Sequence, residues 1–229
     1  MHQSIGKRNK IIIYLIMLIF LTSLNNKNFS SFIKNIFKIN QINIYGISDN
    51  LITQIENNLK YLIDTNILFV DKESISSAIN SYNFIDSFSV TRKYPSELNF
   101  NIEHTVFIAK TIKNNTKYLI GSNGKLISPN AYKENENLPN AFGNFQLKEL
   151  INFIKILNES NFDVSTITDF YYFDNKRWDI RINNNINIKF PNSNLKNKIQ
   201  LAKQILNNNE IKKKIIDLRV SNQVIIDNG

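Results

Sequence analysis

The sequence predicts an α+β fold: a single N-terminal transmembrane helix, a small β-α-α-β-β module, and then an antiparallel β domain with helices. An unbroken apolar run over residues 11–21 predicts the transmembrane helix. Between residues 38 and 103, alternating and helix-spaced apolar segments give the order strand, helix, helix, strand, strand. Alternating segments separated by Asn-rich turns fill much of the remainder. The 229 residues are 42% hydrophobic, which suffices for one or two cores and excludes a disordered chain.

The residues at the N-terminus predict a retained membrane anchor. We expect a cytoplasmic tail over residues 1–10, a transmembrane helix over 11–27 and a linker over 28–37. Basic residues cluster ahead of the apolar run, which favours a cytoplasmic N-terminus and an extracytoplasmic remainder. The run is shorter than the ~20 residues of a usual span, so a cleaved signal peptide is the alternative. Cleavage needs small residues and the first Ala is Ala78, so we favour the anchor.

A module over residues 38–105 is predicted from five elements. They are a strand over 39–45, helices over 51–62 and 71–79, and strands over 84–92 and 98–102. Gly46 ends the first strand, and Ser48 or Asp49 can cap the first helix. Asp71 caps the second helix, and Pro95 marks the turn between the last two strands. The order of these elements predicts a small sheet with two helices on one face.

A second domain is predicted over residues 106–229. Its elements are a hairpin over 118–127, a helix over 147–157, strands over 178–182 and 186–190, a helix over 194–206 and a strand over 215–220. Asn123 and Gly124 are expected to supply the positive dihedrals of the hairpin turn. Three consecutive Asn residues from 183 to 185 predict the turn between the two middle strands.

The alternation of the last strand continues to Ile226 and predicts one apolar and one polar face. At the edge of a sheet, the backbone over residues 217–226 would offer unpaired amides and carbonyls, to which a partner could add a strand. The alternative, which the sequence leaves open, is the final strand of a closed sheet. Lys212, Lys213 and Lys214 precede this strand, and whether they contact a partner or solvent is also open.

The composition excludes most catalytic chemistry. The chain has no Cys, two His and six Gly, so disulfides, zinc-thiolate sites and glycine-rich cofactor loops lack their residues. His104 is the only histidine outside the N-terminal tail and is predicted at a strand end. Residues 121–125 resemble a phosphate-binding loop in composition, but they lie between strands rather than before a helix. We expect no catalytic residue, cofactor, metal or small-molecule substrate. The net charge of +9 suits nucleic acid, anionic lipid or an acidic partner, and its sign does not choose among them.

Several short segments follow one another in a specific order. They are Ile42-Asn43-Ile44-Tyr45-Gly46, Asn66-Ile67-Leu68-Phe69-Val70-Asp71, Val90-Thr91-Arg92-Lys93-Tyr94-Pro95, the hairpin over 118–127 and Asp217-Leu218-Arg219. With the basic tail and single apolar run, they resemble the FtsQ/DivIB family of bacterial cell division proteins. This resemblance implies a POTRA domain over residues 38–105 and an FtsQ-type β domain over 106–229.

The resemblance further implies a non-enzymatic scaffold of the divisome. Such a protein is anchored once in the cell inner membrane at the division septum, with its C-terminal bulk in the periplasm. Its C-terminal strands bind the FtsB/FtsL coiled-coil proteins, and with other divisome components it helps recruit the septal cell-wall synthesis machinery. We do not expect nucleic acid binding, because the domains would lie outside the cytoplasm. The alternative is a periplasmic POTRA-type chaperone or assembly factor for envelope proteins.

The resemblance also indicates partner-binding residues. They are Arg219, Val220, Ser221, Asn222, Gln223, Val224 and Arg177. Arg219 matches the family arginine that pairs with an acidic residue of the partner, whereas Arg177 lies near a second basic contact. Val220 stands where the family often has an aromatic residue.

Overall fold

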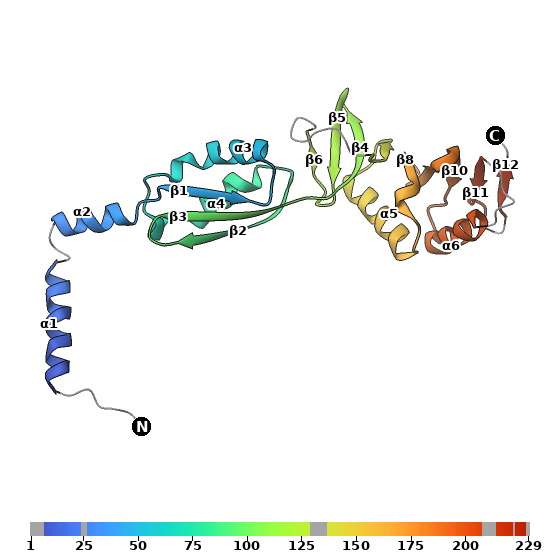
Figure 1. The fold of residues 1–229 in the computed structure, drawn as a ribbon. Helices are drawn as coiled ribbons and strands as arrows, with labels where there is room; N and C mark the ends of the chain where they lie inside the picture. The colour runs from blue at the N-terminus through green and yellow to red at the C-terminus, as the bar shows by residue number, and fades with distance from the viewer. Residues whose placement is uncertain (1–6, 24–26, 129–136, 208–213, 222, 228–229) are drawn as a thin grey trace. The chain divides into compact units, whose positions relative to one another are not determined.

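The computed structural model describes residues 7–23, 27–128, 137–207, 214–221 and 223–227. The chain divides into two compact units, Met1–Glu103 and His104–Gly229. Figure 1 shows helices followed by a small sheet in the first unit, and a larger sheet with helices in the second. Both units mix helices and strands, which confirms the predicted α+β class.

Two helices precede the first sheet. α1 (Lys7–Ser23) carries the apolar residues 11–21 with their side chains exposed. In the part of the chain that the structure describes, no helix has both the length and the hydropathy of a membrane span. α2 (Lys27–Ile36) begins at the last residue of the expected transmembrane helix and covers most of the stretch 28–37 expected to be a linker. Phe32, Ile33 and Ile36 fall on one side of α2, and this helical periodicity explains why the stretch is not irregular.

The first unit contains the predicted strand-helix-helix-strand-strand module. Its elements are β1 (Gln41–Tyr45), α3 (Asp49–Leu59), α4 (Lys72–Asn80), β2 (Ile85–Lys93) and β3 (Glu97–His104), with two short 3-10 helices, η1 (Lys60–Leu62) and η2 (Ile67–Phe69), between α3 and α4. The sheet order is β1-β3-β2, with β1 parallel to β3. Leu51 and Ile55 of α3 are buried, as are Leu98 and Phe100 of β3. The helices therefore close a core against one face of the sheet (Figure 1).

Local capping explains where these elements begin and end. Asp71 accepts hydrogen bonds from the backbone amides of Glu73 and Ser74 at 3.1 and 2.9 Å, which starts α4 as predicted. These bonds lower the pKa of the Asp71 carboxyl. Gly46 follows β1 with a φ of 93°, and a Cβ there would meet the carbonyl oxygen of Ile102.

Over its described residues, the second unit is a nine-stranded sheet with two α-helices and two short 3-10 helices, η4 (Val164–Thr166) and η5 (Asn183–Asn185). Its elements are β4 (Phe107–Lys113), β5 (Thr116–Gly121), β6 (Leu126–Ile127), β7 (Asn140–Phe142), α5 (Leu147–Glu159), β8 (Ile167–Phe173), β9 (Arg177–Ile182), β10 (Ile186–Lys189), α6 (Leu195–Leu206), β11 (Ile215–Asp217) and β12 (Ile225–Asp227). The sheet order is β12-β11-β10-β9-β8-β7-β4-β5-β6.

The expectation of an antiparallel sheet was wrong in part, because the sheet is mixed. β4 pairs with β7, β7 with β8, and β10 with β11 in parallel. A parallel pair needs a crossover connection, and α5 connects β7 to β8 while α6 connects β10 to β11. Helices predicted correctly over 147–157 and 194–206 therefore account for two of the parallel pairings, whereas β4 and β7 are connected through β5 and β6.

The hairpin turn differs in detail from the prediction. Gly124 has a φ of 75°, whereas Asn123 is not among the residues with a positive φ. The amide of Gly124 donates to the carbonyl of Gly121 at 3.0 Å, and the Asn123 side chain accepts from the amide of Lys125 at 3.1 Å. Asn123 thus shapes the turn through its side chain, and only Gly124 supplies the left-handed backbone.

The expectation of one continuous strand reaching Ile226 was wrong. β11 ends at Asp217, the chain reverses, and β12 pairs with β11 antiparallel, with Ile216 opposite Ile226. β11 also pairs with β10, so both of its edges are occupied. Of the described strands, β12 and β6 end the sheet.

Candidate partner-binding site

The two faces of the sheet in the second unit differ in chemistry. Ile180, Ile188 and Ile216 lie opposite one another on β9, β10 and β11 and are buried in the core that α5 and α6 complete. In the register of the same strands, Lys189 of β10 lies opposite Asp179 of β9 and opposite Asp217 of β11. Since side chains alternate along a strand, this charged row lies on the face opposite the core. We call this the outer face.

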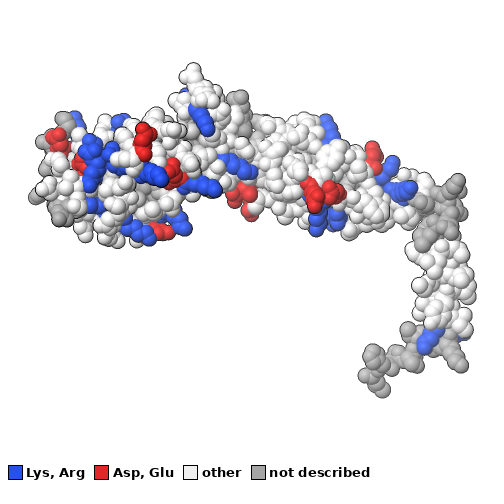
Figure 2. Space-filling view, turned by 180° about the vertical axis from the view of Figure 1, so that it is seen from behind, with Lys and Arg blue, Asp and Glu red and all other residues white. Residues whose placement is uncertain are grey.

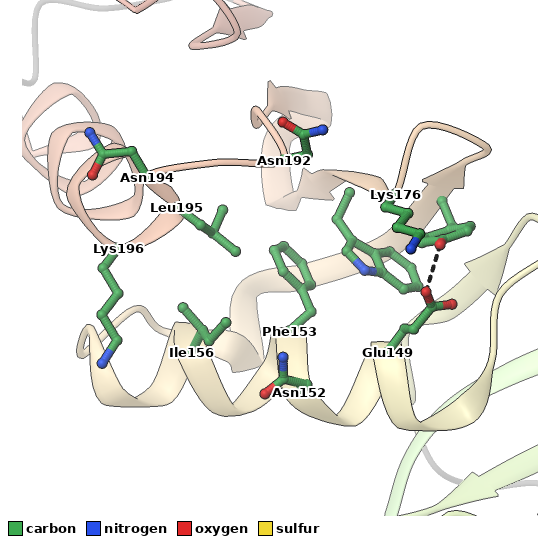
Figure 3. A pocket seen from close by; sticks show the side chains of 11 residues that line it. Glu149, Asn152, Phe153, Ile156, Lys176, Asn192, Asn194, Leu195 and Lys196 are labelled. Atoms are coloured by element: carbon green, nitrogen blue, oxygen red, sulfur yellow. Dashed lines mark hydrogen bonds between the residues drawn. The ribbon is translucent and has the colours of Figure 1, made fainter.

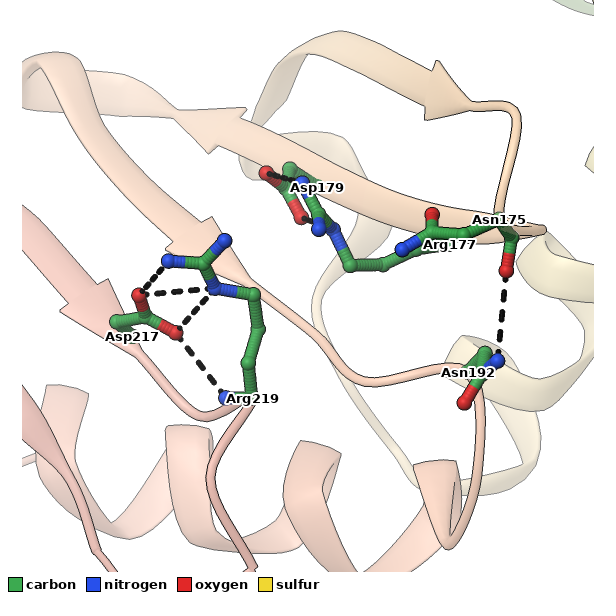
Figure 4. Close-up of polar contacts among 6 residues, drawn as sticks. All are labelled: Asn175, Arg177, Asp179, Asn192, Asp217 and Arg219. Atoms are coloured by element: carbon green, nitrogen blue, oxygen red, sulfur yellow. Dashed lines mark hydrogen bonds and ion pairs between the residues drawn. The ribbon is translucent and has the colours of Figure 1, made fainter.

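Arg219 is held on the outer face by Asp217. Its Nε lies 2.8 and 2.9 Å from the two carboxylate oxygens, and its Nη2 binds the same carboxylate (Figure 4). Its backbone amide also donates to Asp217 at 3.1 Å. Hydrogen bonds from Arg219 lower the pKa of the Asp217 carboxyl despite its burial. The Arg219 side chain remains 43% exposed. Asp217 binds the Nε and Nη2 atoms of the guanidinium, and Nη1 is the nitrogen that it does not bind.

Arg177 forms a second pair of the same kind. Its Nε donates to Asp179 at 3.1 Å (Figure 4). Its guanidinium also lies 4.2 Å from the centre of the Phe173 ring. Burial raises the pKa of the Asp179 carboxyl, and Arg177 and Arg219 both oppose that rise. The structure therefore brings the two predicted arginines into one electrostatic cluster around Asp179. Arg177 is only 15% exposed and so offers less contact surface than Arg219.

The other predicted site residues lie in the connection between β11 and β12. Val220, Ser221 and Gln223 are exposed and Val224 is half-buried, whereas Asn222 lies outside the described residues. Lys198 of α6 reaches this connection, and its Nζ donates to the carbonyl oxygens of Val220 and Ser221 at 2.8 and 3.0 Å. Lys198 is itself buried, at 7% exposure. A helix on the core side thus fixes the loop that carries the predicted site.

β12 provides an edge beside this cluster. Its Ile225 lies opposite Asp217 and is 51% exposed. An edge strand carries backbone donors and acceptors that a further strand can pair with. The candidate site therefore combines a strand edge with a fixed, partly exposed guanidinium next to it.

Comparison with protein families agrees with this architecture. Residues 111–219 match the family described as cell division protein FtsQ/DivIB, C-terminal, and residues 37–103 match the POTRA domain, FtsQ-type. The chain belongs to the FtsQ/DivIB family. A search of curated proteins returned no match.

Membership of the FtsQ/DivIB family gives the chain a role in cell division. The family is a family of non-catalytic division scaffolds. The FtsQ/DivIB match ends at residue 219 and so includes Arg177 and Arg219, whereas β12 lies beyond it.

A hollow of about 490 Å³ lies on the helical side of this FtsQ/DivIB β domain (Figure 3). Phe153, Ile156 and Leu195 form part of its apolar wall, and Asn152 and Lys196 contribute polar groups. Its one carboxylate, Glu149, accepts a hydrogen bond from the Tyr172 hydroxyl at 2.8 Å and another from the amide of Gln146 at 2.9 Å. These bonds lower the pKa of Glu149. Glu149 thus caps α5 and holds the Tyr172 hydroxyl.

Sequence reasoning named the two arginines of this candidate site but missed their acidic partners. Arg177 and Asp179, like Asp217 and Arg219, are two positions apart, which places both members of each pair on one side of an extended chain. This spacing was a usable signal. Lys198 gave no comparable signal, because it lies 22 residues from Val220 in the sequence.

Proposed function

We propose that this chain is a non-enzymatic, membrane-anchored divisome scaffold that binds FtsB/FtsL-type coiled-coil proteins and helps recruit the septal cell-wall synthesis machinery. Family membership supports the cell division role. The observation that carries the binding proposal is the β12 edge beside the Arg219–Asp217 pair. The chain would act by protein binding alone, and no cluster of potential metal ligands occurs in the part of the chain that the structure describes.

In this proposal the partner adds a strand to β12. Main-chain hydrogen bonds give affinity in this mode of binding, and neighbouring side chains give specificity. Nη1 of Arg219 would meet an acidic side chain of the partner. Because Asp217 already aligns the guanidinium, the partner's carboxylate would complete an existing charge network.

The proposed location is the inner membrane at the division septum, with α1 as the anchor. The residues from Ile11 to Leu21 expose apolar side chains on every side of the helix, which suits lipid better than water. The basic residues Arg8 and Lys10 support an N-terminus in the cytoplasm and a remainder in the periplasm.

The matched pair Arg219→Gln and Arg181→Gln tests this site. Arg181 is also on the outer face, lies 3.6 Å from Asp169 and is 40% exposed, so it closely resembles Arg219 in setting. We expect Arg219→Gln to weaken binding of a peptide from the membrane-proximal periplasmic segment of the FtsB-type partner by about tenfold or more. Binding by Arg181→Gln should remain near wild type. Equal binding by all three full-length proteins in nanodiscs would refute the role of Arg219.

The strand edge is tested separately by cross-linking. The chain has no Cys, so Ile225→Cys introduces a single thiol on β12. Cysteines placed along the partner peptide should form disulfides with it at alternate positions, since side chains alternate along an added strand. Leu126→Cys on β6, at the opposite end of the sheet, is the control. Cross-linking without a two-residue period, or equally strong at β6, would rule out strand addition at β12.

A second candidate function is an assembly factor or chaperone for envelope proteins. The observation that favours it is a hollow of about 590 Å³ beside β2, one of the two edge strands of the first sheet, with Ile75, Phe88 and Val90 in its lining. An extended peptide could bind there. Capture of unfolded envelope proteins by the full chain, abolished by Val90→Glu and unaffected by Arg219→Gln, would favour this function.

A further inference from the structure

An exposed apolar surface marks one end of the POTRA module. Phe69 is 83% exposed, Tyr94 56% and Leu68 44%. With Phe37, these residues form what we call the aromatic end. These exposed side chains are not needed for the module's core. Ile67, next to Leu68, is fully buried and already packs the segment against that core.

Backbone contacts hold the aromatic end together. The amide of Ile67 donates to the carbonyl of Phe37 at 2.8 Å, and Lys38 forms a β-bridge with Asn66. The Asn66 side chain accepts from the amide of Leu68 at 2.9 Å and caps η2, the short helix that carries Leu68 and Phe69. The rings of Phe37 and Tyr94 meet edge to face at 6.4 Å. The surface is therefore a built feature rather than a frayed loop.

α2 leads directly into the aromatic end. The amide of Phe37 donates to the carbonyl of Ile33, so the last turn of α2 is continuous with the first residue of this surface. On α2, Phe32 is 59% and Ile36 is 37% exposed, while Lys34 and Asn35 lie on the other side of the helix. A helix of this kind, with one apolar and one polar face, suits the boundary between lipid headgroups and acyl chains.

Basic side chains slightly outnumber acidic ones around this surface. Lys34, Lys38 and Lys72 are exposed, and Lys93 is paired with Glu97 at 2.9 Å. Two carboxylates flank η2 in the sequence. Asp64 precedes it, and Asp71 follows it and caps α4. Figure 2 shows a surface without charge along most of α1, and charges of both signs over the module. Burial of apolar rings, rather than charge, would therefore dominate contact with a bilayer.

We propose that the aromatic end and the apolar side of α2 lie in the headgroup boundary of the same bilayer that holds α1. This inference rests on the anchoring proposed above. The occupant is lipid rather than another protein, because the last turn of α2 leads straight into Phe37 and both segments combine exposed apolar side chains with lysines. Aromatic side chains and lysine stems are the groups that favour the membrane interface. The module would then stand on the membrane, with Phe69 inserted about as deeply as interfacial helices are, roughly 5–10 Å.

Spin labels at single cysteines test the proposal in the full chain. We would attach a nitroxide to Phe69→Cys and, in a second variant, to Leu68→Cys. Both sites are exposed, so the fold should tolerate the label. Asp86→Cys is the control, because Asp86 is exposed at the start of β2, at the opposite end of the module from the β2–β3 turn that carries Tyr94. The proteins are reconstituted in nanodiscs of phosphatidylethanolamine and phosphatidylglycerol.

The ratio of oxygen to nickel-chelate accessibility should be several-fold higher at residues 68 and 69 than at residue 86. Equal, water-like ratios at all three sites in chains that co-purify with nanodiscs would overturn this proposal and leave the anchor intact. Chains that do not co-purify with nanodiscs would overturn both. Protection of residue 69 that arises only when the FtsB-type partner is added would identify a protein interface and also refute the lipid contact.

Discussion

Replacing Lys198 by methionine is expected to loosen the connection between β11 and β12 while leaving α6 in place. The ammonium group of Lys198 donates to two carbonyl oxygens of that connection, at 2.8 and 3.0 Å. Methionine keeps most of the apolar stem that packs in the core and removes both bonds. The variant therefore tests whether one buried cation positions the loop that carries Val220 and Ser221.

The expected magnitude follows from the two hydrogen bonds. Each bond to a charged group contributes about 1.5–3 kcal/mol, but Val220 and Ser221 are exposed and their carbonyls can regain water. A net loss of about 2 kcal/mol is therefore reasonable. At about 1.4 kcal/mol for each factor of ten, this corresponds to roughly 30-fold faster hydrogen exchange for amides that exchange by opening of this connection.

The assay is hydrogen-deuterium exchange of the full chain in nanodiscs, read by mass spectrometry on peptides that cover β11 and β12. Lys203→Met is the matched control, because Lys203 is on the same helix and donates to the carbonyl of Ser160 at 3.1 Å, away from β12. Exchange near β12 should rise only in Lys198→Met. If both variants match wild type there, or if both change equally, Lys198 does not fix the connection.

Three further outcomes are expected. Gly46→Ala should destabilise the POTRA module by roughly 1–3 kcal/mol, because alanine is strained at a φ of 93° and its Cβ meets the carbonyl of Ile102. The urea midpoint of unfolding should therefore fall, and an unchanged midpoint would contradict this. The lowered pKa of Asp71 means that its contribution to stability is present above the ordinary value of 3.8 and is lost as pH falls through the lower folded value. Asp71→Asn keeps the cap, so protection of α4 should become insensitive to acid, and an acid response equal to wild type would refute this. Arg177→Met should raise the pKa of buried Asp179 further. A carboxyl with a raised pKa makes stability fall as pH rises, so the drop in Tm relative to wild type should be larger at pH 8 than at pH 5. An equal drop at both pH values would count against it.

The POTRA module was predictable because its signals are local. Asp71 caps α4 with its own side chain, Gly46 ends β1 through its backbone, and Leu98 and Phe100 alternate with polar residues in β3. The helix α2 carried a signal of the same kind, since Phe32, Ile33 and Ile36 recur at helical spacing. The prediction of a linker over residues 28–37 assigned no secondary structure to it, and this spacing could have indicated the helix.

The C-terminal hairpin was not predictable from local patterns. Apolar residues occupy positions 216, 218, 220, 224 and 226, so a single strand with its alternation broken only at Asn222 was a reasonable interpretation of the pattern. The interruption comes from tertiary contacts, because Lys198 binds the carbonyls of Val220 and Ser221, which a continuous strand would offer to a neighbouring strand. The parallel pairings of β7 with β8 and of β10 with β11 likewise depend on where α5 and α6 return the chain. The arginines of the candidate site followed from the resemblance, and a strand edge near the C-terminus was one of the two alternatives that the sequence left open. That this edge belongs to a separate strand, β12, did not follow from the sequence.

The pairing of Arg219 with Asp217 has a consequence for the kinetics of association. A flexible surface arginine loses rotamer freedom when it binds, at a cost of about 0.5–1.5 kcal/mol for each ordered side chain. Folding has already ordered this guanidinium through its bonds to Asp217. The same carboxylate neutralises much of its long-range field, so Arg219 would contribute little to attracting a partner from a distance. Its effect would fall on the lifetime of the complex, so that Arg219 variants alter the dissociation rate much more than the association rate.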